Sequence, residues 1–592
     1  MLKGTPSSIC QPLLILFKRS LNEGIYPNQW KRANVMPLFK KGDRDTLSNY
    51  RPISLISCVG KVMERIIYKH LFNHLHANNL IFKNQSGFLP KHSTVYQLID
   101  IYNQICKGYN DKQFTSFVFC DISKAFDRVW HRGLLHKLKE NGINHKVLNW
   151  ISNYLSKRSQ SVFVGNSSSK AKYISAGVPQ GSVLGPLFFL IYVNDITESL
   201  QSVTRLFADD SSLATTSNNP YSTEVLINTD LSNILEWSKQ WLVNFNPAKT
   251  ESMFCSFANF DKPKLTFDNH VINSVDFHKH LGLTLSCDGT WHNHIQNIIA
   301  STNKILGSMK ALKFKLHRKT LNQIYLAYLR PHLEYGSIVW DNCTTYEKEL
   351  LEKIQYEAAR IVTGLTRSVS NTTLINETGW ITLEQRRKIQ KLILVYKYTT
   401  GELPAYLSNL FPPYVRDVNQ YNLRNSNDFA IIPARLEIFK NSTIPSSVSL
   451  WNALDSNTKN SENLNSFKRK LNSIYKGSNV PSFFITGDRY YSVIHCRLRN
   501  KCSNLNFDLY TNHLRDDPFC EYCNEPEDSE HFLLRCRRYN DARLIMFQNT
   551  RPYHTLSTAK LLYGNPLLND KENAIIFKEV QRFIKSTGRF RQ

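Results

Sequence analysis

The chain has 592 residues, 42% of them hydrophobic, and is therefore long enough for several separate cores. Its 74 lysines and arginines outnumber 48 acidic residues and give a net charge of +26, which favours a polyanionic partner such as nucleic acid. Its longest apolar runs fall well short of the roughly 20 residues that a membrane span needs, and no signal peptide is apparent at the N-terminus, so the sequence argues against a membrane or secreted protein.

The first informative element is a near-continuous apolar run, Phe114 to Cys120, that ends in an acid, Asp121. Such a run predicts a buried strand that places a carboxylate at its C-terminal end. A helix is expected to begin just afterwards, around Ser123 to Phe126. Capping that helix is the structural alternative for the Asp121 carboxylate.

Next comes the stretch 175–196, SAGVPQGSVLGPLFFLIYVNDI, which predicts a glycine-rich loop followed by an apolar helix from about Leu184. Gly177, Gly181 and Gly185 allow the loop backbone to approach a ligand closely. A glycine-rich loop alone is weak evidence for a site. Its position between two acidic segments of the chain makes it a candidate.

Residues 202–216, SVTRLFADDSSLATT, predict a β-hairpin with strands over 203–207 and 213–216 and a tip at 208–211. Such tips usually carry Asn-Gly or Asp-Gly, because these residues accept positive φ angles at low cost. Here the tip carries two adjacent acids, Asp209 and Asp210. Their mutual repulsion has to be offset by a cation or by basic neighbours, unless the turn is simply exposed to solvent.

If the strand that ends at Asp121 pairs beside this hairpin, Asp121, Asp209 and Asp210 meet at one edge of a sheet. Their oxygens suit Mg²⁺, a hard cation that also keeps positions for water and substrate phosphates. Two Mg²⁺ ions held in this way would clamp the attacking and leaving oxygens of an in-line phosphoryl transfer. Two further acids, Asp127 and Asp195, are expected only to cap helices or to pair with arginines.

Helices are predicted from about residue 290 onwards, because apolar residues recur at spacings of three and four over 294–312 and 346–364. A polymerase thumb and a generic helical bundle both fit this pattern. A third helix is predicted between an N-cap at Thr382 and a stop at Gly401. Its basic residues predict either contact with a phosphate backbone or a solvated basic face. They are Arg386, Arg387, Lys388 and Lys391.

Seven of the 12 cysteines are scattered singly, which argues against a disulfide framework and favours a reducing compartment. Near the C-terminus, the spacing C-x2-C-x7-H-x4-C instead predicts one structural Zn²⁺ bound by three thiolates and an imidazole. The ligands would be Cys520, Cys523, His531 and Cys536. The arginines at 535, 537 and 538 suit nucleic acid, and three reduced cysteines in a small core are the alternative. Cys496 and Cys502 lack a second matching pair and are expected to be core residues.

Taken in order, the motifs resemble the palm of reverse transcriptases from non-LTR (LINE-type, jockey-like) retrotransposons. The matching palm segments are CDISKAFDRVW, GVPQGSVLGPLFFLIYVNDI and FADDSSL. Upstream, WKRANVMPLFKKGDRDTLSNYRPISLISCVGKVMERII and NQSGFLPKHST resemble the fingers segments. Downstream, WLVNFNPAKTE and HLGLTLS resemble the last palm motif and the primer-grip hairpin. The resemblance covers about residues 10 to 285, and the order of the segments is more specific than any one of them.

The resemblance implies catalytic roles for five positions. Asp121, Asp209 and Asp210 would hold two Mg²⁺ ions, and the carbonyl of Ile122 would be a further ligand. Lys249 matches a palm lysine that would protonate pyrophosphate as it leaves, which is general-acid work.

The resemblance also implies how a nucleotide would bind. Phe126 matches an aromatic gate that excludes a ribose 2′-OH, and Gln180 and Gly181 match a loop that contacts the incoming nucleotide and the template. Arg51, with Lys40 or the lysine after it, would bind the triphosphate, since a guanidinium fork suits phosphate oxygens. The alternatives are a core position for Phe126 and solvated surface charge for the cations.

The expected fold is α+β: a right-hand polymerase with fingers, palm and thumb, followed by a mostly helical region and a small C-terminal zinc knuckle. The expected segments are 1–110 for the fingers, 111–285 for the palm with part of the fingers, 286–400 for a thumb-like helical region, 401–480 for a loop-rich connector and 481–592 for a C-terminal domain with the Cys-Cys-His-Cys knuckle.

The leading hypothesis is an RNA-directed DNA polymerase that extends a DNA primer or target on an RNA template, using dNTPs and two-metal nucleotidyl transfer. A catalytically silent nucleic-acid-binding protein, decayed or domesticated, is the alternative; the presence of all three acids argues against it. A group II intron-like maturase shares the palm but should lack the knuckle.

Related elements usually carry an apurinic-type endonuclease before the polymerase. This chain begins about thirty residues before its first fingers motif, so we assign no nicking activity to it. We expect a ribonucleoprotein in the nucleus and cytoplasm, without a membrane partner.

Overall fold

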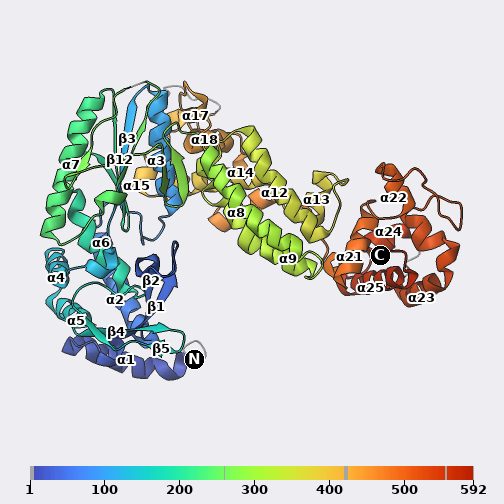
Figure 1. Cartoon of the computed structure of the whole chain (residues 1–592), viewed down its shortest axis with the longest axis horizontal. Coiled ribbons are helices and arrows are strands. Elements are labelled where there is room, and N and C mark those ends of the chain that lie inside the picture. The colour runs from blue at the N-terminus through green and yellow to red at the C-terminus, as the bar shows by residue number, and fades with distance from the viewer. Residues whose placement is uncertain (1–5, 259, 419–424, 476, 554–556, 591–592) are drawn as a thin grey trace. The chain divides into compact units, whose positions relative to one another are not determined.

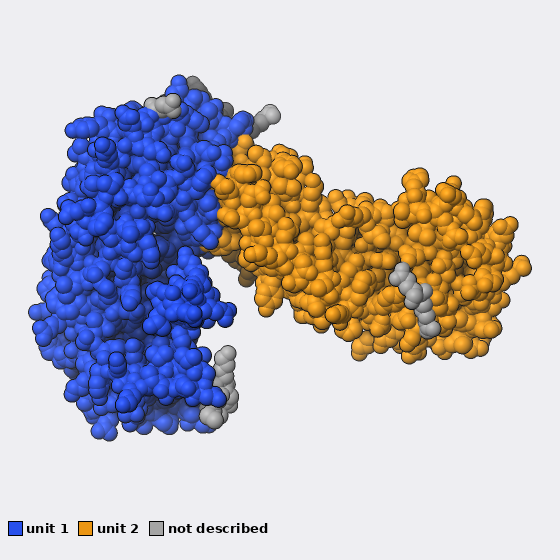
Figure 2. All heavy atoms as spheres, in the orientation of Figure 1, with its two compact units in different colours: residues 1–290, 401–413, 432–440 blue, residues 291–400, 414–431, 441–592 orange. Residues whose placement is uncertain are grey.

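The computed structural model describes the chain except residues 1–5, 259, 419–424, 476, 554–556 and 591–592. The described residues form two compact units. The first contains residues 1–290, 401–413 and 432–440, and the second contains 291–400, 414–431 and 441–592. Figure 2 shows the two units in different colours. This division is coarser than the five segments expected above, whose boundaries stay predictions.

One sheet of the first unit, which we call the central sheet, has five strands in the order β12-β9-β3-β8-β7. Figure 1 labels two of these strands, β3 and β12. Its strands are β3 (Phe114–Asp121), β7 (Val203–Phe207), β8 (Asp210–Ser217), β9 (Glu251–Cys255) and β12 (Asn273–Ser274). β3 pairs antiparallel with both β8 and β9, and every residue of β3 before Asp121 is buried. The buried strand predicted from the apolar run is therefore confirmed.

A second sheet in the first unit has the order β2-β1-β4-β5, with β6 also paired to β4. It consists of β1 (Arg32–Phe39), β2 (Tyr50–Leu55), β4 (Arg158–Val164), β5 (Ser167–Ser168) and β6 (Lys172–Ile174). Two small hairpins complete the strands: β10 (Thr266–Phe267) with β11 (His270–Val271), and β13 (Phe277–His280) with β14 (Leu283–Ser286). The second of these hairpins lies where the primer-grip hairpin is predicted.

The helices of the first unit are α1 (Pro6–Glu23), α2 (Cys58–Ala77), α3 (Thr94–Asn110), α4 (His131–Glu140), α5 (His145–Leu155), α6 (Leu184–Val193), α7 (Pro220–Gln240), α15 (Ala405–Ser408) and α17 (Glu437–Lys440). The apolar helix predicted from about Leu184 is α6, and all its side chains except that of Pro186 are buried. The Glu64 carboxylate on α2 accepts hydrogen bonds from the Val183 and Leu184 amides and so caps α6.

The helix expected directly after Asp121 is wrong. Only a single 3-10 turn, Ala125–Arg128, follows the strand, and the next α-helix begins at His131. Lys124 has a φ angle of 52° in the left-handed region, which an α-helix cannot contain. The chain therefore makes a tight corner after β3 instead of continuing as a helix.

The second unit is helical. Its helices are α8 (His292–Ala311), α9 (Arg318–Ile324), α10 (Arg330–Glu334), α11 (Ser337–Trp340), α12 (Thr345–Thr363), α13 (Asn371–Thr378), α14 (Leu383–Thr399), α16 (Val415–Val418), α18 (Thr443–Asn452), α19 (Ser456–Lys459), α20 (Leu464–Ile474), α21 (Arg489–Arg499), α22 (Asn506–Thr511), α23 (Asn540–Thr550), α24 (Thr558–Tyr563) and α25 (Asp570–Thr587). Thr382 caps α14 through a capping box, and Gly401 follows its end with a φ angle of 68°, as predicted.

The expected phosphate contact or solvated face of α14 is wrong for two of its cations. Arg387 and Lys391 are buried, and both pair with Asp341, at 2.6 Å and 2.5 Å. Arg386 pairs with Glu334, and Lys388 pairs with Glu384 one turn earlier on α14. Three of these cations therefore join α14 to α10 and to Asp341 directly after α11, whereas Lys388 stays partly exposed and pairs within its own helix.

Buried polar contacts join the helices around α12 to α21. The Arg489 guanidinium donates hydrogen bonds to the carbonyls of Lys313, Ile361 and Val362, which lie at the ends of α8 and α12. Glu377 pairs with Arg318 at 2.9 Å and also with Arg499 of α21. Among the described residues, no helix combines the length and the apolar character of a membrane span.

Candidate active site and metal centre

The three predicted acids meet at one end of the central sheet. Asp121 on β3 and Asp210 on β8 are direct partners in the antiparallel register. Asp209 lies beside them in the two-residue turn Ala208–Asp209, which connects the paired residues Phe207 and Asp210. The hairpin tip is thus shorter than expected, because β8 begins at Asp210 rather than at residue 213. The structure confirms that the three carboxylates converge.

The neighbouring groups shift the acidity of this cluster. Desolvation raises the pKa of Asp210 to about 6, and the nearby carboxylates of Asp209 and Asp121 act in the same direction against the opposing charge of Lys40. The pKa of Asp209 is also raised, first by desolvation and then by Asp121. Three acids that disfavour each other's charge are stabilised by a bound cation. Hard carboxylate oxygens are the donors that Mg²⁺ prefers, so the donor set fits this ion.

Lys40, Arg51 and Lys249, the predicted cations, lie within electrostatic reach of the acids. The Lys249 ammonium is 3.6 Å from a carboxylate oxygen of Asp121. Lys40 lowers the pKa of both Asp209 and Asp210, and Arg51 lowers that of Asp209. Lys40 and Arg51 come from the β1–β2 hairpin, where Arg51 is the register partner of Leu38. Two elements distant in sequence thus supply positive charge to one acidic site.

Ile122, whose carbonyl is a predicted metal ligand, directly follows Asp121. It lies opposite Phe245 in an isolated antiparallel bridge. Two backbone hydrogen bonds flank this bridge, from the Asn246 amide to the Asp121 carbonyl and from the Ser123 amide to the Asn244 carbonyl. The role of the Ile122 carbonyl stays a prediction.

Phe126, the predicted aromatic gate, is half-buried in the 3-10 turn that follows β3. Its ring stacks on Phe189 of α6 at a centroid distance of 5.0 Å and contacts the edge of Phe88 at 6.0 Å. The ring is therefore partly a core residue, while the rest of it remains accessible. Both interpretations offered by the sequence are compatible with this position.

The glycine-rich loop is fixed between β2 and the turn after β3. The Gln180 carbonyl accepts a hydrogen bond of 2.7 Å from the Ser54 amide, and its side chain donates one of 3.1 Å to Asp127. Gly181 has a φ angle of 121°, and a Cβ there would lie 2.7 Å from the Ser54 carbonyl oxygen. Only glycine fits this close approach.

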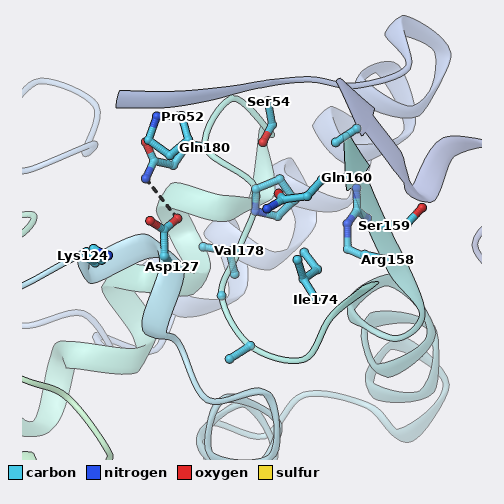
Figure 3. Close-up of a pocket in the computed structure, with 14 residues that line it drawn as sticks. Pro52, Ser54, Lys124, Asp127, Arg158, Ser159, Gln160, Ile174, Val178 and Gln180 are labelled. Atoms are coloured by element: carbon cyan, nitrogen blue, oxygen red, sulfur yellow. Dashed lines mark hydrogen bonds between the residues drawn. The ribbon is translucent and has the colours of Figure 1, made fainter. Parts of the chain in front are cut away.

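A pocket of about 270 Å³ opens beside this loop (Figure 3). Gln180, Asp127 and Lys124 line it from the loop and the turn, and Ser54 lines it from β2. The sequence predicts that Asp127 only caps a helix or pairs with an arginine. Its carboxylate instead accepts the hydrogen bond from Gln180, and desolvation raises its pKa. Asp195 pairs with Lys137 at 2.5 Å, which confirms its structural role with a lysine in place of an arginine.

Sequence reasoning missed the contribution of Gln85, which lies in the NQSGF segment. Its side-chain oxygen accepts a hydrogen bond from the Ala208 amide at 3.1 Å, directly before the two hairpin acids. The only sequence signal was that the segment resembles a fingers motif. The contact itself joins residues 123 positions apart and cannot be found by local pattern.

The four predicted zinc ligands also meet, in the second unit. One ligand atom from each of Cys520, Cys523, His531 and Cys536 lies within 4.8 Å of the others. The Cys536 sulfur is 3.9 Å from each of the other two sulfurs, close to the roughly 3.8 Å separation of two thiolates on one tetrahedral Zn²⁺.

The donors around this cluster fit a metal. The Nε2 atom of His531 is buried and has no hydrogen-bond partner in the described part of the chain. Its Nδ1 atom lies 3.2 Å from Glu525, an arrangement typical of metal-bound histidines. The Arg537 amide donates a hydrogen bond of 3.3 Å to the Cys523 sulfur. Cys496 and Cys502 are buried in a separate cluster with Leu374, as expected for core residues.

Residues 39–295 match the family model described as reverse transcriptase (RNA-dependent DNA polymerase). The chain is 30% identical to a probable RNA-directed DNA polymerase from transposon X-element of Drosophila melanogaster, over 63% of this chain and 42% of that protein. It is also 30% identical to the RNA-directed DNA polymerase from mobile element jockey of the same species, over 61% of this chain and 40% of that protein. The chain spans about two fifths of the length of these relatives.

Among solved structures, apo telomerase from Candida tropicalis aligns over 68% of each chain with 11% identity and a TM-score of 0.34, too low to carry a conclusion. The family match and the curated relatives agree with the site's geometry. The chain contains a reverse transcriptase domain. It is related to the jockey-like reverse transcriptases of non-LTR retrotransposons.

Proposed function

We propose that this chain is an RNA-directed DNA polymerase that extends a DNA primer on an RNA template with dNTPs. The observation that carries the proposal is the convergence of Asp121, Asp209 and Asp210 at one end of the central sheet. The β1–β2 hairpin brings Lys40 and Arg51 to the same place, where they suit the phosphates of a nucleotide.

The acids would hold two Mg²⁺ ions, since three converging carboxylates supply suitable oxygens and leave positions for substrate. When bound, such ions neutralise the charge of the triphosphate and activate the primer hydroxyl. Lys249 is placed beside Asp121, where a protonated amine can deliver a proton to the departing pyrophosphate.

The side chains around the acids would select and orient the nucleotide. The accessible part of Phe126 would pack against the sugar and leave no room for a 2′-OH. The Gln180–Gly181 backbone, held by Ser54, would contact the base pair that forms. Asp127 would keep the Gln180 side chain in place during this contact.

The Cys-Cys-His-Cys cluster would bind one structural Zn²⁺. Three sulfurs and the buried Nε2 atom of His531, which has no hydrogen-bond partner among the residues that the structure describes, supply four donors, as a tetrahedral structural site requires. The Arg538 guanidinium stacks on the Tyr522 ring 4.4 Å from its centroid, beside the cluster. This exposed aromatic and cationic pair suits a single-stranded nucleic acid. We also propose that the protein works as a ribonucleoprotein in the nucleus and cytoplasm.

The testing experiment is primer extension on poly(rA) with an oligo(dT) primer, dTTP and Mg²⁺, comparing the purified chain with Asp209→Ala/Asp210→Ala. We expect extension by the first and none by the second. Binding of RNA by both proteins without extension by either would overturn the proposal. The chain would then be a nucleic-acid-binding remnant, the alternative class.

A further inference from the structure

The turn that carries two of the acids is held by a segment far away in sequence. Residues 84–87 lie along the free edge of β7 and extend the central sheet. The Leu206 amide donates to the Asn84 carbonyl at 3.2 Å, and the Ser86 amide donates to the Leu206 carbonyl at 2.9 Å. Gln85 and Leu206 thus form a parallel bridge. This bridge ends two residues before the acidic turn begins.

The Gln85 side chain continues the contact into the turn itself. Its oxygen accepts two hydrogen bonds, from the Gly87 amide at 2.7 Å and from the Ala208 amide at 3.1 Å. Gln85 is only 3% exposed, so water cannot replace these bonds. Gly87 packs so closely that a Cβ there would lie 2.3 Å from the Ala208 nitrogen. A side chain at 87 would therefore displace the turn.

The turn needs such support because its backbone is strained. Ala208 has a φ angle of 57°, in the left-handed region that a residue with a Cβ rarely adopts. Asp209 and Asp210 follow at once and repel each other, and both features favour a looser turn. The Gln85 contact opposes this loosening.

Residues 84–87 are themselves held by Tyr406, which lies 320 positions after Ser86 in the sequence. The Ser86 hydroxyl and the Tyr406 hydroxyl are 2.9 Å apart, and Tyr406 is buried. The Arg205 guanidinium lies over the Tyr406 ring and pairs with Asp100 at 2.7 Å. Residues 401–413 belong to the first unit together with the acids, so the whole chain of contacts lies in one compact body.

We propose that Gln85 is a positioning residue that fixes the Ala208–Asp209 turn and thereby sets the spacing of the Asp209 and Asp210 carboxylates for divalent cations. This inference rests on the proposed function. It adds a group that touches neither metal nor substrate and acts through the Ala208 amide.

The experiment compares Gln85→Met, which has a similar volume but no accepting oxygen, with Gln97→Met. Gln97 is a matched control, because it is also buried in the first unit and its side-chain amide has no hydrogen-bond partner among the described residues. Hydrogen exchange of residues 205–212 reports on the turn, and electron paramagnetic resonance of free Mn²⁺ reports on cation binding without any catalysis.

We expect Gln85→Met to speed amide exchange in the 205–212 segment and to weaken Mn²⁺ binding about tenfold, with Gln97→Met close to wild type. In primer extension, kcat should fall about tenfold while the KM for dTTP changes little. Gln85→Glu keeps an accepting oxygen and should restore slow exchange. Gly87→Ala tests the same contact if Gln85→Met does not fold, and it should weaken Mn²⁺ binding as well.

Wild-type exchange and Mn²⁺ binding in Gln85→Met would overturn the inference. Failure of the wild-type chain to extend primers would refute the proposed function instead. The exchange and Mn²⁺ measurements would still decide the role of Gln85 in that case.

Discussion

Phe126 packs in the core, and we propose that the accessible part of its ring also excludes a ribose 2′-OH. Its stacking on Phe189 fixes the ring, and part of the ring stays accessible. We predict that Phe126→Val increases incorporation of rNTPs relative to dNTPs by about tenfold or more, because space opens for a 2′-OH. Competitive single-nucleotide incorporation measures this ratio. Phe88→Val is the matched control, since Phe88 contacts the same ring but is 50% exposed. If Phe126→Val left the ratio of rNTP to dNTP incorporation unchanged, Phe126 would act only as a core residue.

Lys249 is the second residue whose role can be isolated. Its ammonium is 3.6 Å from Asp121 but largely exposed, so the pair adds at most about 1 kcal/mol to stability. We predict that Lys249→Gln lowers kcat about tenfold to a hundredfold, within the usual range for a general acid, and leaves the unfolding midpoint almost unchanged. Pre-steady-state extension assays and thermal unfolding test the two parts. A drop in stability without a change in kcat would contradict the general-acid role.

Single residues also mark the limit of sequence reasoning. Asp121, Asp209 and Asp210 were found because an apolar strand ending in an acid and an acidic hairpin tip are local patterns. Gln85 was not, because its partner is 123 residues away. The sequence likewise predicts phosphate contact or a solvated face for Arg387 and Lys391. It does not reveal their partner, because Asp341 lies 46 and 50 positions before them. Pairing between distant residues decides such roles, and the spacing of apolar residues along the sequence does not reveal which distant residues pair.

At the scale of elements, the β13–β14 hairpin carries a buried titratable group. Burial, and next the neighbouring His278, lower the pKa of His280 to about 3. Its Nε2 atom has no hydrogen-bond partner within the described ranges, and the ring packs against Phe119 of β3. His278 also faces Phe119 and bonds to Glu251, so it is the other group that titrates here.

The sign of the pH effect follows from this lowered pKa. Below pH 6.5 His280 binds a proton in the unfolded chain but stays neutral in the folded hairpin. The free energy of unfolding therefore falls as the pH drops towards 3. We predict a loss of about 2 kcal/mol between pH 7 and pH 5, measured by urea unfolding. His280→Leu should remove this contribution to the pH dependence, whereas replacement of the exposed His270 by Leu should not. Equal slopes in both variants would exclude His280 as the source.

In α14, two basic residues that the sequence predicts at the surface are buried and paired with an acid. Asp341 neutralises both buried cations, Arg387 and Lys391. We predict that Asp341→Asn destabilises the second unit by about 3–5 kcal/mol, because two buried cations lose their partner. Thermal unfolding tests this loss. The salt dependence of RNA binding by Arg387→Gln tests separately whether Arg387 contacts phosphate. If RNA binding by Arg387→Gln depended less steeply on salt concentration while its stability were unchanged, Arg387 would contact phosphate after all.

At the scale of the whole molecule, the two units depend on different chemistry. The first contains a broad core of buried apolar residues packed around its sheet. The second ends in a small cluster of buried residues that includes Cys520 and Cys536, where burial, and next the neighbouring Cys520, raise the pKa of Cys536 to about 12. Thiols crowded in this way are more easily deprotonated when a Zn²⁺ ion takes their charge.

Metal removal should therefore act on the C-terminal part of the chain first. We predict one Zn²⁺ per chain by metal analysis, its loss in Cys523→Ser and its retention in Cys287→Ser, which changes a cysteine of the first unit. Chelation should increase hydrogen exchange across residues 515–540 and lower the unfolding midpoint of the second unit. The Cys520 and Cys536 side chains belong to the same core as Phe532 and Phe583, so the loosening should spread to α25. Unchanged exchange after complete chelation would show that these side chains pack as a reduced core and need no metal.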